Sequence, residues 1–239
     1  MIYTHLITFR DCSNSEILLK KISNKNRNYL SVGDDAFDLR SDYSCRNEFN
    51  DLFKHKKVIL CQFRNTNYEK QYALKYWKQL AAYIETLALE NKNICFVFIS
   101  MSNGDRVNDT NIATKIKKFT KKAEIIVIAK ILTPEMAKGF FKNAYLSIGQ
   151  SYHFGVFSLA EGVPFVGCFS NKYYEDKLGG LLEWYDHKEF LLPENKLSKL
   201  PSLVGNIIEQ NTQIKEGIVK VNKQKIKNIN KVFHIMENI

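Results

Sequence analysis

The residues best suited to anion binding and proton transfer come directly after apolar runs of strand length. Arg64 follows the run 58–63, and Ser151, Tyr152 and His153 follow the run 145–148 and open an expected helix. An arginine can bind a phosphate or carboxylate through two parallel hydrogen bonds, and a helix N-terminus attracts anions. A histidine can donate to a bound anion or take a proton from a hydroxyl. A capping or core role for His153 fits its position equally well.

Further polar residues follow two other apolar runs. Asn103 and Asp105 lie in a polar loop after the run 94–100 and could orient the hydroxyls of a sugar, although a solvated loop explains them as well. Lys172 and Lys177 come after the run 163–168 and are either additional cations of the site or surface lysines. No His, Cys and Asp residues cluster at the spacing of metal ligands, so we expect neither a structural metal nor a cofactor.

The elements that must position these residues alternate between strand and helix over residues 57–170. Apolar strands separated by helices of about 10–20 residues predict parallel β-α-β units and a sheet covered on both faces, which is a Rossmann-like α/β fold. In such a sheet, ligands bind outside the carboxyl ends of the strands. We therefore expect Arg64 and His153 at one edge of the sheet. The predicted strands span residues 58–63, 94–100, 124–129, 145–148 and 163–168.

Composition and charge exclude several classes of protein. No apolar run among the 239 residues approaches the about 20 residues of a membrane span, and the first residues lack the pattern of a secretory signal. Five cysteines without a C-x-x-C pair favour a reducing cytoplasm. The net charge is +10, but the basic residues are mostly scattered lysines, whereas nucleic-acid binding favours clustered arginines. We expect a cytoplasmic protein with no nucleic-acid partner.

The chain divides into four parts by pattern. Residues 1–40 hold two short strands and one helix, too little to close a core, and read as the remnant of an N-terminal α/β domain. Residues 41–56 are a polar connecting segment, and 57–200 form the Rossmann-like domain. Residues 201–239 form a basic amphipathic C-terminal helix, whose apolar stripe is broken by Lys225. This helix either packs on the protein or a missing N-terminal half, or associates peripherally with the inner face of the membrane.

Several blocks together resemble a known family. Residues 151–166 read SYHFGVFSLAEGVPFV and are similar to the signature block of the polysaccharide pyruvyl transferase family, in which an arginine, an apolar residue and a histidine precede a helix of small residues and then Gly-Val-Pro. The family arginine corresponds to Ser151. The resemblance covers most of residues 1–185. Further similar blocks, in the family's order, are Phe9-Arg10-Asp11, residues 33–37, Phe63-Arg64, Thr133-Pro134-Glu135 and residues 172–177.

The resemblance implies the C-terminal half of a glycosyltransferase-B-like two-domain fold, with the N-terminal half largely missing. It also implies transfer of a pyruvyl group from phosphoenolpyruvate to two hydroxyls of a glycan or lipid-linked sugar in cell-envelope polysaccharide synthesis. His153 is then the catalytic acid or base. Alternatives are a glycosyltransferase that uses a nucleotide sugar, and a non-catalytic sugar-binding remnant. The implied donor contacts are Arg64, Ser151, Tyr152, Lys172 and Lys177, and the implied acceptor contacts are Asn103 and Asp105.

Overall fold

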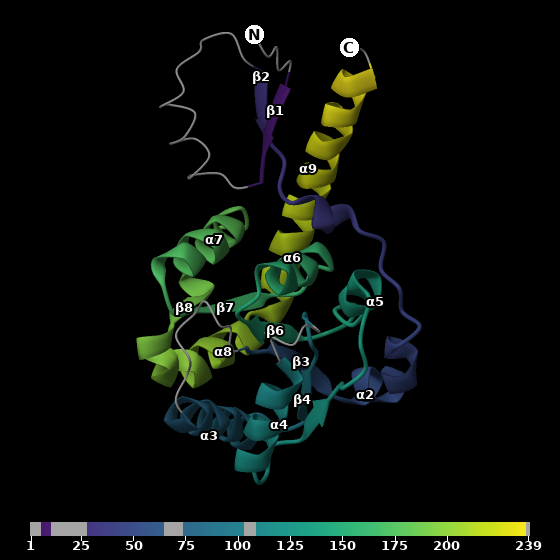
Figure 1. Ribbon diagram of the computed structural model, residues 1–239. Coiled ribbons are helices and arrows are strands. Elements are labelled where there is room, and N and C mark those ends of the chain that lie inside the picture. The colour runs from purple at the N-terminus through teal and green to yellow at the C-terminus, as the bar shows by residue number, and fades with distance from the viewer. Residues whose placement is uncertain (1–5, 11–27, 65–73, 103–108, 238–239) are drawn as a thin grey trace.

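Six parallel strands form the centre of the protein (Figure 1), in a computed structural model that describes residues 6–10, 28–64, 74–102 and 109–237. The strand order is β5-β4-β3-β6-β7-β8. The chain therefore starts in the middle at β3, moves outward to β5, returns to β6 beside β3, and moves outward again. This is the doubly wound order of a Rossmann fold. The strands are β3 (Lys57–Gln62), β4 (Ile94–Phe98), β5 (Ile125–Val127), β6 (Leu146–Gly149), β7 (Phe165–Phe169) and β8 (Leu191–Pro193).

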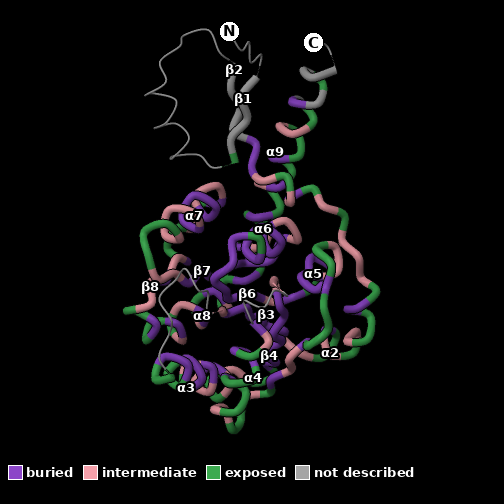
Figure 2. The backbone as a smooth tube through the Cα atoms, viewed as in Figure 1, coloured by how far each residue is buried: buried purple, intermediate pink, exposed green. Residues whose placement is uncertain are grey.

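The central strands are apolar because helices cover both faces of the sheet. Every residue of β4 and β6 is buried, as is every residue of β3 after Lys57, and Figure 2 shows this buried core. The helices α3 (Leu74–Glu90), α4 (Asp109–Phe119) and α8 (Leu200–Glu209) cover one face in Figure 1. The opposite face carries α5 (Pro134–Gly139), α6 (Tyr152–Ala160) and α7 (Lys172–Glu183).

The predicted sheet is confirmed, with two differences outside residues 57–170. β8 is a sixth strand where the sequence indicated only a loop, because a three-residue strand that ends in proline has no recognisable pattern. The C-terminal part forms two helices, α8 and α9 (Asn211–Glu237), rather than one. In the described ranges, no helix has both the length and the apolar character needed to cross a bilayer.

The N-terminal part is a small unit beside the upper half of α9. β1 (Leu6–Phe9) pairs in parallel with β2 (Asn28–Ser31), and the predicted helix between them lies outside the described residues. The short helix η1 (Asp35–Asp38) then lies against α6. The buried Lys138 of α5 holds η1 in place, because its Nζ donates to the carbonyl oxygens of Phe37 and Leu39, each at 2.6 Å.

The connecting segment after η1 runs along α5. Its backbone passes so close to Gly139 that a Cβ there would collide with the carbonyl group of Asp42. The amide of Asp42 donates to the carbonyl oxygen of Glu135 at 2.9 Å. The segment then forms two short helices and enters the sheet at β3. These helices are η2 (Arg46–Phe49) and α2 (Asn50–His55), and the remaining 3-10 helices, on either side of β8, are η3 (Lys188–Phe190) and η4 (Glu194–Lys199).

The contact between α6 and β7 depends on a glycine. A Cβ on Gly155 would lie 2.5 Å from Cε1 of Phe165 and 2.9 Å from Cδ2 of Leu181. We therefore expect Gly155→Ala to lower the free energy of unfolding by about 1–3 kcal/mol through overpacking, measured by urea denaturation. Gly205→Ala in α8 is the matched control, because no atom lies within 4 Å of its Cβ and alanine favours the helix. Equal effects of the two substitutions would contradict the packing argument.

Candidate functional site

A cavity of about 750 Å³ lies at the carboxyl edge of the sheet, at the point where the winding reverses. β3 and β6 are neighbours there, and their following helices leave toward opposite faces, which opens the crevice where α/β proteins bind ligands. Arg64 follows β3, and Ser151 and His153 follow β6; all three line the cavity. The other walls come from η1, the loop after β4, α6 and the start of α5: Asp35, Ala36, Asp38, Leu39, Ser100, Met101, Ser102, Leu132, Thr133, Pro134, Ala137 and Phe157.

The buried amide of Gln62 ties together the loops that form the floor of this site. Its Nε2 donates to Oδ2 of Asp109 at 2.9 Å. Its Oε1 accepts from the amides of Gln150 at 3.3 Å and Ser151 at 2.9 Å. Gln150 in turn accepts through Oε1 from the amide of Arg64 at 2.9 Å. One side chain of β3 thereby fixes both the start of α4 and the entry into α6.

Arg64, which lines the cavity, and the buried Asp109, which does not, are the charged groups of this hydrogen-bond network. Burial raises the pKa of Asp109, while the charge of Arg64 and hydrogen bonds from the Met101 amide and Gln62 oppose the rise. Both side chains keep a buried atom, Oδ1 of Asp109 and Nε of Arg64, with no hydrogen-bond partner in the described part of the chain. A buried donor without a partner is costly, so the Arg64 guanidinium is positioned to gain from an incoming anion.

The entry into α6 brings backbone amides to the cavity. Ser151 is the N-cap residue of α6, but its side chain makes no capping hydrogen bond to the described residues. The first amides of a helix have no partner within it and carry a partial positive charge. Gly149 permits the tight entry, because a Cβ there would lie 2.7 Å from Cδ1 of Phe154. The loop and helix start therefore form an anion-binding geometry.

His153 faces a carboxylate from the N-terminal part of the chain. Its Nε2 lies 3.9 Å from Oδ1 of Asp34, which caps η1 by accepting from the amide of Ala36 at 3.0 Å. Partial burial lowers the pKa of His153, and the charge of Asp34 opposes this effect. The positive charges of Lys177, Arg10 and Arg64 lower the pKa further. At neutral pH the ring is therefore neutral and able to accept a proton.

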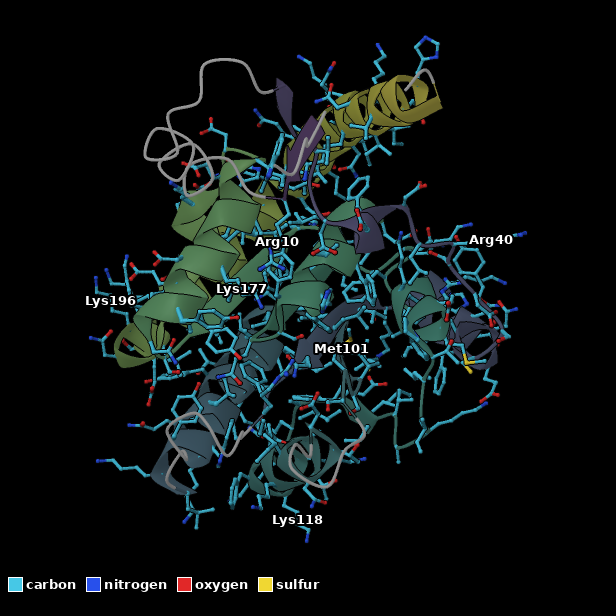
Figure 3. The ribbon with its side chains drawn as sticks, turned by 45° about the horizontal axis from the view of Figure 1, so that its top comes forward. Arg10, Arg40, Met101, Lys118, Lys177 and Lys196 are labelled. Carbon is cyan, nitrogen blue, oxygen red and sulfur yellow. The ribbon has the colours of Figure 1, made fainter. Side chains whose placement is uncertain are left out.

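Two cations lie over the ring of Tyr152, the neighbour of His153. The guanidinium carbon of Arg10 lies 4.7 Å from the ring centroid, and Nζ of Lys177 lies 5.3 Å from it. Nη1 of Arg10 also pairs with Oδ2 of Asp34 at 3.7 Å. Figure 3 shows Arg10 and Lys177 close together near the middle of the view, whereas Arg40, Lys118 and Lys196 lie toward its edges. The site thus combines a neutral histidine with several cations.

Of the sequence-predicted site residues, Arg64, Ser151 and His153 line the cavity, whereas Tyr152 and Lys177 lie beside His153 and do not line it. Lys172 lies outside this cavity: its Nζ pairs with Glu175 at 3.2 Å and Asp176 at 2.9 Å, and it lines another cavity, near β7 and β8. Asn103 and Asp105 lie outside the described residues. Among the residues that the structure describes, no three His, Cys, Asp or Glu gather as metal ligands, and the absence of a structural metal stays a prediction.

Arg10 and Asp34 were not among the candidate site residues of the sequence analysis. A signal for both was present, because Arg10 directly follows β1 and Asp34 comes soon after β2. The rule that ligands meet the carboxyl ends of parallel strands applies to this small sheet as well. Their proximity to His153 depends on how the N-terminal unit packs on α6, which the pattern of one sequence does not show.

The charge of Asp34 provides a test of the His153 environment. We expect Asp34→Asn to lower the pKa of His153 further, because the carboxylate is what opposes the effects of burial and of the neighbouring cations. The measurement is an NMR titration of the histidine rings, with the His153 signal assigned through His153→Ala. Asp35→Asn, a neighbouring carboxylate of η1, is the control and should change this pKa less. An unchanged or higher pKa in Asp34→Asn would contradict the assigned pairing.

Comparison with solved structures shows the same fold at low identity. MnaA of S. aureus, solved with UDP, aligns with a TM-score of 0.62 at 13% identity over 98% of this chain and 61% of that one. A protein described as a UDP-N-acetylglucosamine 2-epimerase from Listeria monocytogenes aligns with a TM-score of 0.63 at 12% identity, over 98% of this chain and 60% of that one. A UDP-forming trehalose-phosphate synthase from Burkholderia vietnamiensis aligns with a TM-score of 0.60 at 11% identity, over 97% of this chain and 58% of that one. The chain thus spans about three fifths of these proteins.

These matches confirm the Rossmann-like fold and carry no information on activity at such identities. No curated protein matches the sequence. The profile of the family described as polysaccharide pyruvyl transferase, however, matches residues 3–173, which include β1, η1 and the sheet through β7. With more than half of its residues matched by that profile, the chain belongs to the polysaccharide pyruvyl transferase family.

Proposed function

We propose that this chain transfers the pyruvyl group of phosphoenolpyruvate to two hydroxyls of a sugar. In this reaction the methylene carbon of the donor gains a proton, the first hydroxyl oxygen bonds to the central carbon, and phosphate leaves. The second hydroxyl then closes a cyclic ketal and gives its proton to the released phosphate, so one donor and one diol give one ketal and one phosphate. The chemistry needs cations for two anionic groups, a base for the hydroxyl and an acid for the carbon.

One observation carries the proposal: a single cavity at the switch point of the sheet holds Arg64, the N-terminus of α6 and His153. Arg64 lines the cavity and offers its guanidinium group to the donor phosphate or carboxylate, and the amides at the start of α6 offer a second anion-binding element. His153 is neutral at neutral pH and accepts the proton of the sugar hydroxyl. As the imidazolium, which Asp34 stabilises, it can return this proton to the methylene carbon.

Arg10 and Lys177 supply further positive charge beside His153. Ser151 occupies the position of the family arginine and lacks its charge. The two cations on the ring of Tyr152 supply part of that positive charge instead. Their charge also keeps the pKa of His153 low. The two cations beside Tyr152 therefore act on the donor through their charge, and the donor has fewer direct contacts than in a site with an arginine at position 151.

The acceptor in this proposal is a glycan or a lipid-linked sugar of the cell envelope, modified in the cytoplasm at the inner face of the membrane. The exposed lysines of α9 support a position near an anionic surface; they are Lys220, Lys223 and Lys227.

Binding of donor candidates tests the proposed function directly. Isothermal titration of the protein with phosphoenolpyruvate should show binding that inorganic phosphate weakens by competition. UDP is the alternative ligand, because a glycosyltransferase that uses nucleotide sugars would bind it instead. Release of phosphate from phosphoenolpyruvate on addition of glycan fractions, with the pyruvyl group retained on the glycan, would establish the transfer. Binding of UDP without phosphoenolpyruvate would overturn the proposal.

The role of Arg64 predicts a loss of donor affinity. We expect Arg64→Met to weaken binding of phosphoenolpyruvate by about 10- to 100-fold, which corresponds to a charge-assisted contact of roughly 1.5–3 kcal/mol. The affinity of Arg64→Lys should lie between those of the unmodified protein and Arg64→Met, because lysine keeps the charge but lacks the planar guanidinium group. Arg40→Met is the matched control, because Arg40 lies at the periphery in Figure 3. If Arg64→Met bound phosphoenolpyruvate with unchanged affinity, the anion would bind elsewhere.

The serine at position 151 predicts the opposite change. Ser151 lines the cavity, so an arginine there has space to extend toward the donor. We expect Ser151→Arg to strengthen binding of phosphoenolpyruvate by about 10- to 100-fold and His153→Ala to weaken it. Calorimetric titration of the three proteins measures both effects. Unchanged affinity in both folded variants would assign the loop 149–153 a purely structural role.

A further inference from the structure

The strongest feature outside the cavity is a buried lysine in α9. Lys225 is only 3% exposed, and aromatic rings surround its Nζ. The distances from Nζ to the ring centroids are 4.5 Å for Trp184, 4.8 Å for Tyr185 and 5.3 Å for Phe37. A cation over the faces of desolvated rings is attracted by their electrons, and these contacts join three parts of the chain. The rings come from η1 and from the end of α7.

The N-terminal segment is shaped to receive this ammonium group. Gly33 has a φ of 95°, a conformation that residues with a side chain rarely adopt. The Nζ of Lys225 lies 3.4 Å from the position that a Cβ of Gly33 would occupy. Residue 34, which directly follows, is the aspartate that faces His153. Lys225 thus contacts the residue before Asp34 and the ring of Phe37 after it.

The second charged partner of the site is held by the same cluster. The Nε1 of Trp184 donates to the carbonyl oxygen of Arg10 at 3.2 Å, while its ring lies against Lys225. Tyr185 donates its hydroxyl to Oδ1 of Asn222 at 3.0 Å. Asn222, one turn before Lys225, donates to the carbonyl oxygen of Leu159 at 2.7 Å and so fixes α9 on α6. The ammonium group therefore lies where α6, α7, α9 and the N-terminal segment meet.

We propose that Lys225 is a positioning residue, whose ammonium group in the Phe37, Trp184 and Tyr185 cluster holds Asp34 and Arg10 against His153 and Tyr152. Lys225 itself does not line the cavity, so it acts through the two segments that it holds. This inference rests on the proposed function for its catalytic meaning. The placement that it describes is measurable without any substrate.

The test is a double-mutant cycle read by NMR titration of His153. The charged groups acting on this ring are Asp34, Lys177, Arg10 and Arg64. In the unmodified background, we expect Asp34→Asn to shift the pKa of His153 downward. If Lys225 positions Asp34, the same substitution should shift the pKa by less than about half as much in a Lys225→Met background, because the carboxylate no longer faces the ring. Lys225→Arg should preserve most of the shift.

Two further variants keep the test decisive. Lys223→Met removes an exposed lysine two residues away on α9 and should leave the shift unchanged. Phe37→Leu removes one ring of the cluster while Lys225 remains, and it should also reduce the shift. This variant replaces Lys225→Met in the test if Lys225→Met does not fold. An equal shift in the Lys225→Met or Phe37→Leu background would overturn the inference. A protein that binds no phosphoenolpyruvate but shows the coupling would refute the proposed function alone.

Discussion

The hydrogen bonds of Gln62 are the constraint on which the site depends. A primary amide buried between strands must find partners for both its donor and its acceptor atoms, or folding pays the cost of desolvating them. Here the partners are the carboxylate of Asp109 and the amides that lead into α6. Satisfying one side chain therefore sets the relative positions of the loops after β3, β4 and β6. Arg64 and His153 meet across the cavity because these loops cannot move independently.

A second constraint comes from two buried lysines that both contact η1. Lys138 donates to carbonyl oxygens of η1, and burial lowers its pKa, although the charges of Glu161 and Asp38 oppose this effect. Lys225 instead contacts aromatic faces. Lys138 therefore fixes the backbone around η1, and Lys225 fixes the ring of Phe37. Between them, the Asp34 carboxylate is held beside a histidine that would otherwise lie among cations alone.

Most of the sheet was predictable, because continuous apolar runs bounded by polar residues have few other interpretations. The helix start at Thr133 and Pro134 was predictable for a similar reason, since the Thr133 hydroxyl accepts from the amide of Met136. Lys172 lies outside the cavity because α7 starts beyond β7, one strand away from the switch point between β3 and β6, and its role as a donor contact stays a prediction. Strand order decides this distance, and local pattern does not contain it.

Lys225 is a clear example of what the hydrophobic periodicity of a sequence cannot predict. In the sequence it interrupts an apolar stripe, and a charged residue in such a position normally indicates a face turned toward solvent. The structure instead buries it, because a ring of η1 and two rings at the end of α7 surround its ammonium group. Arg10 and Asp34 were missed for the same reason. Contacts between distant segments depend on tertiary packing, which no local rule includes.

The contact between Gly33 and Lys225 also has a consequence for the order of events during synthesis. About 190 residues separate the two positions in the chain. At a translation rate of about 5–20 residues per second, the segment that carries Asp34 leaves the ribosome roughly 10–40 s before α9 is made. All six strands are made during this interval, and β8 ends about 30 residues before Lys225, so the sheet can pair before α9 reaches the N-terminal unit. The contact of Lys225 with the N-terminal segment can thus form only after the strands of the sheet have been made.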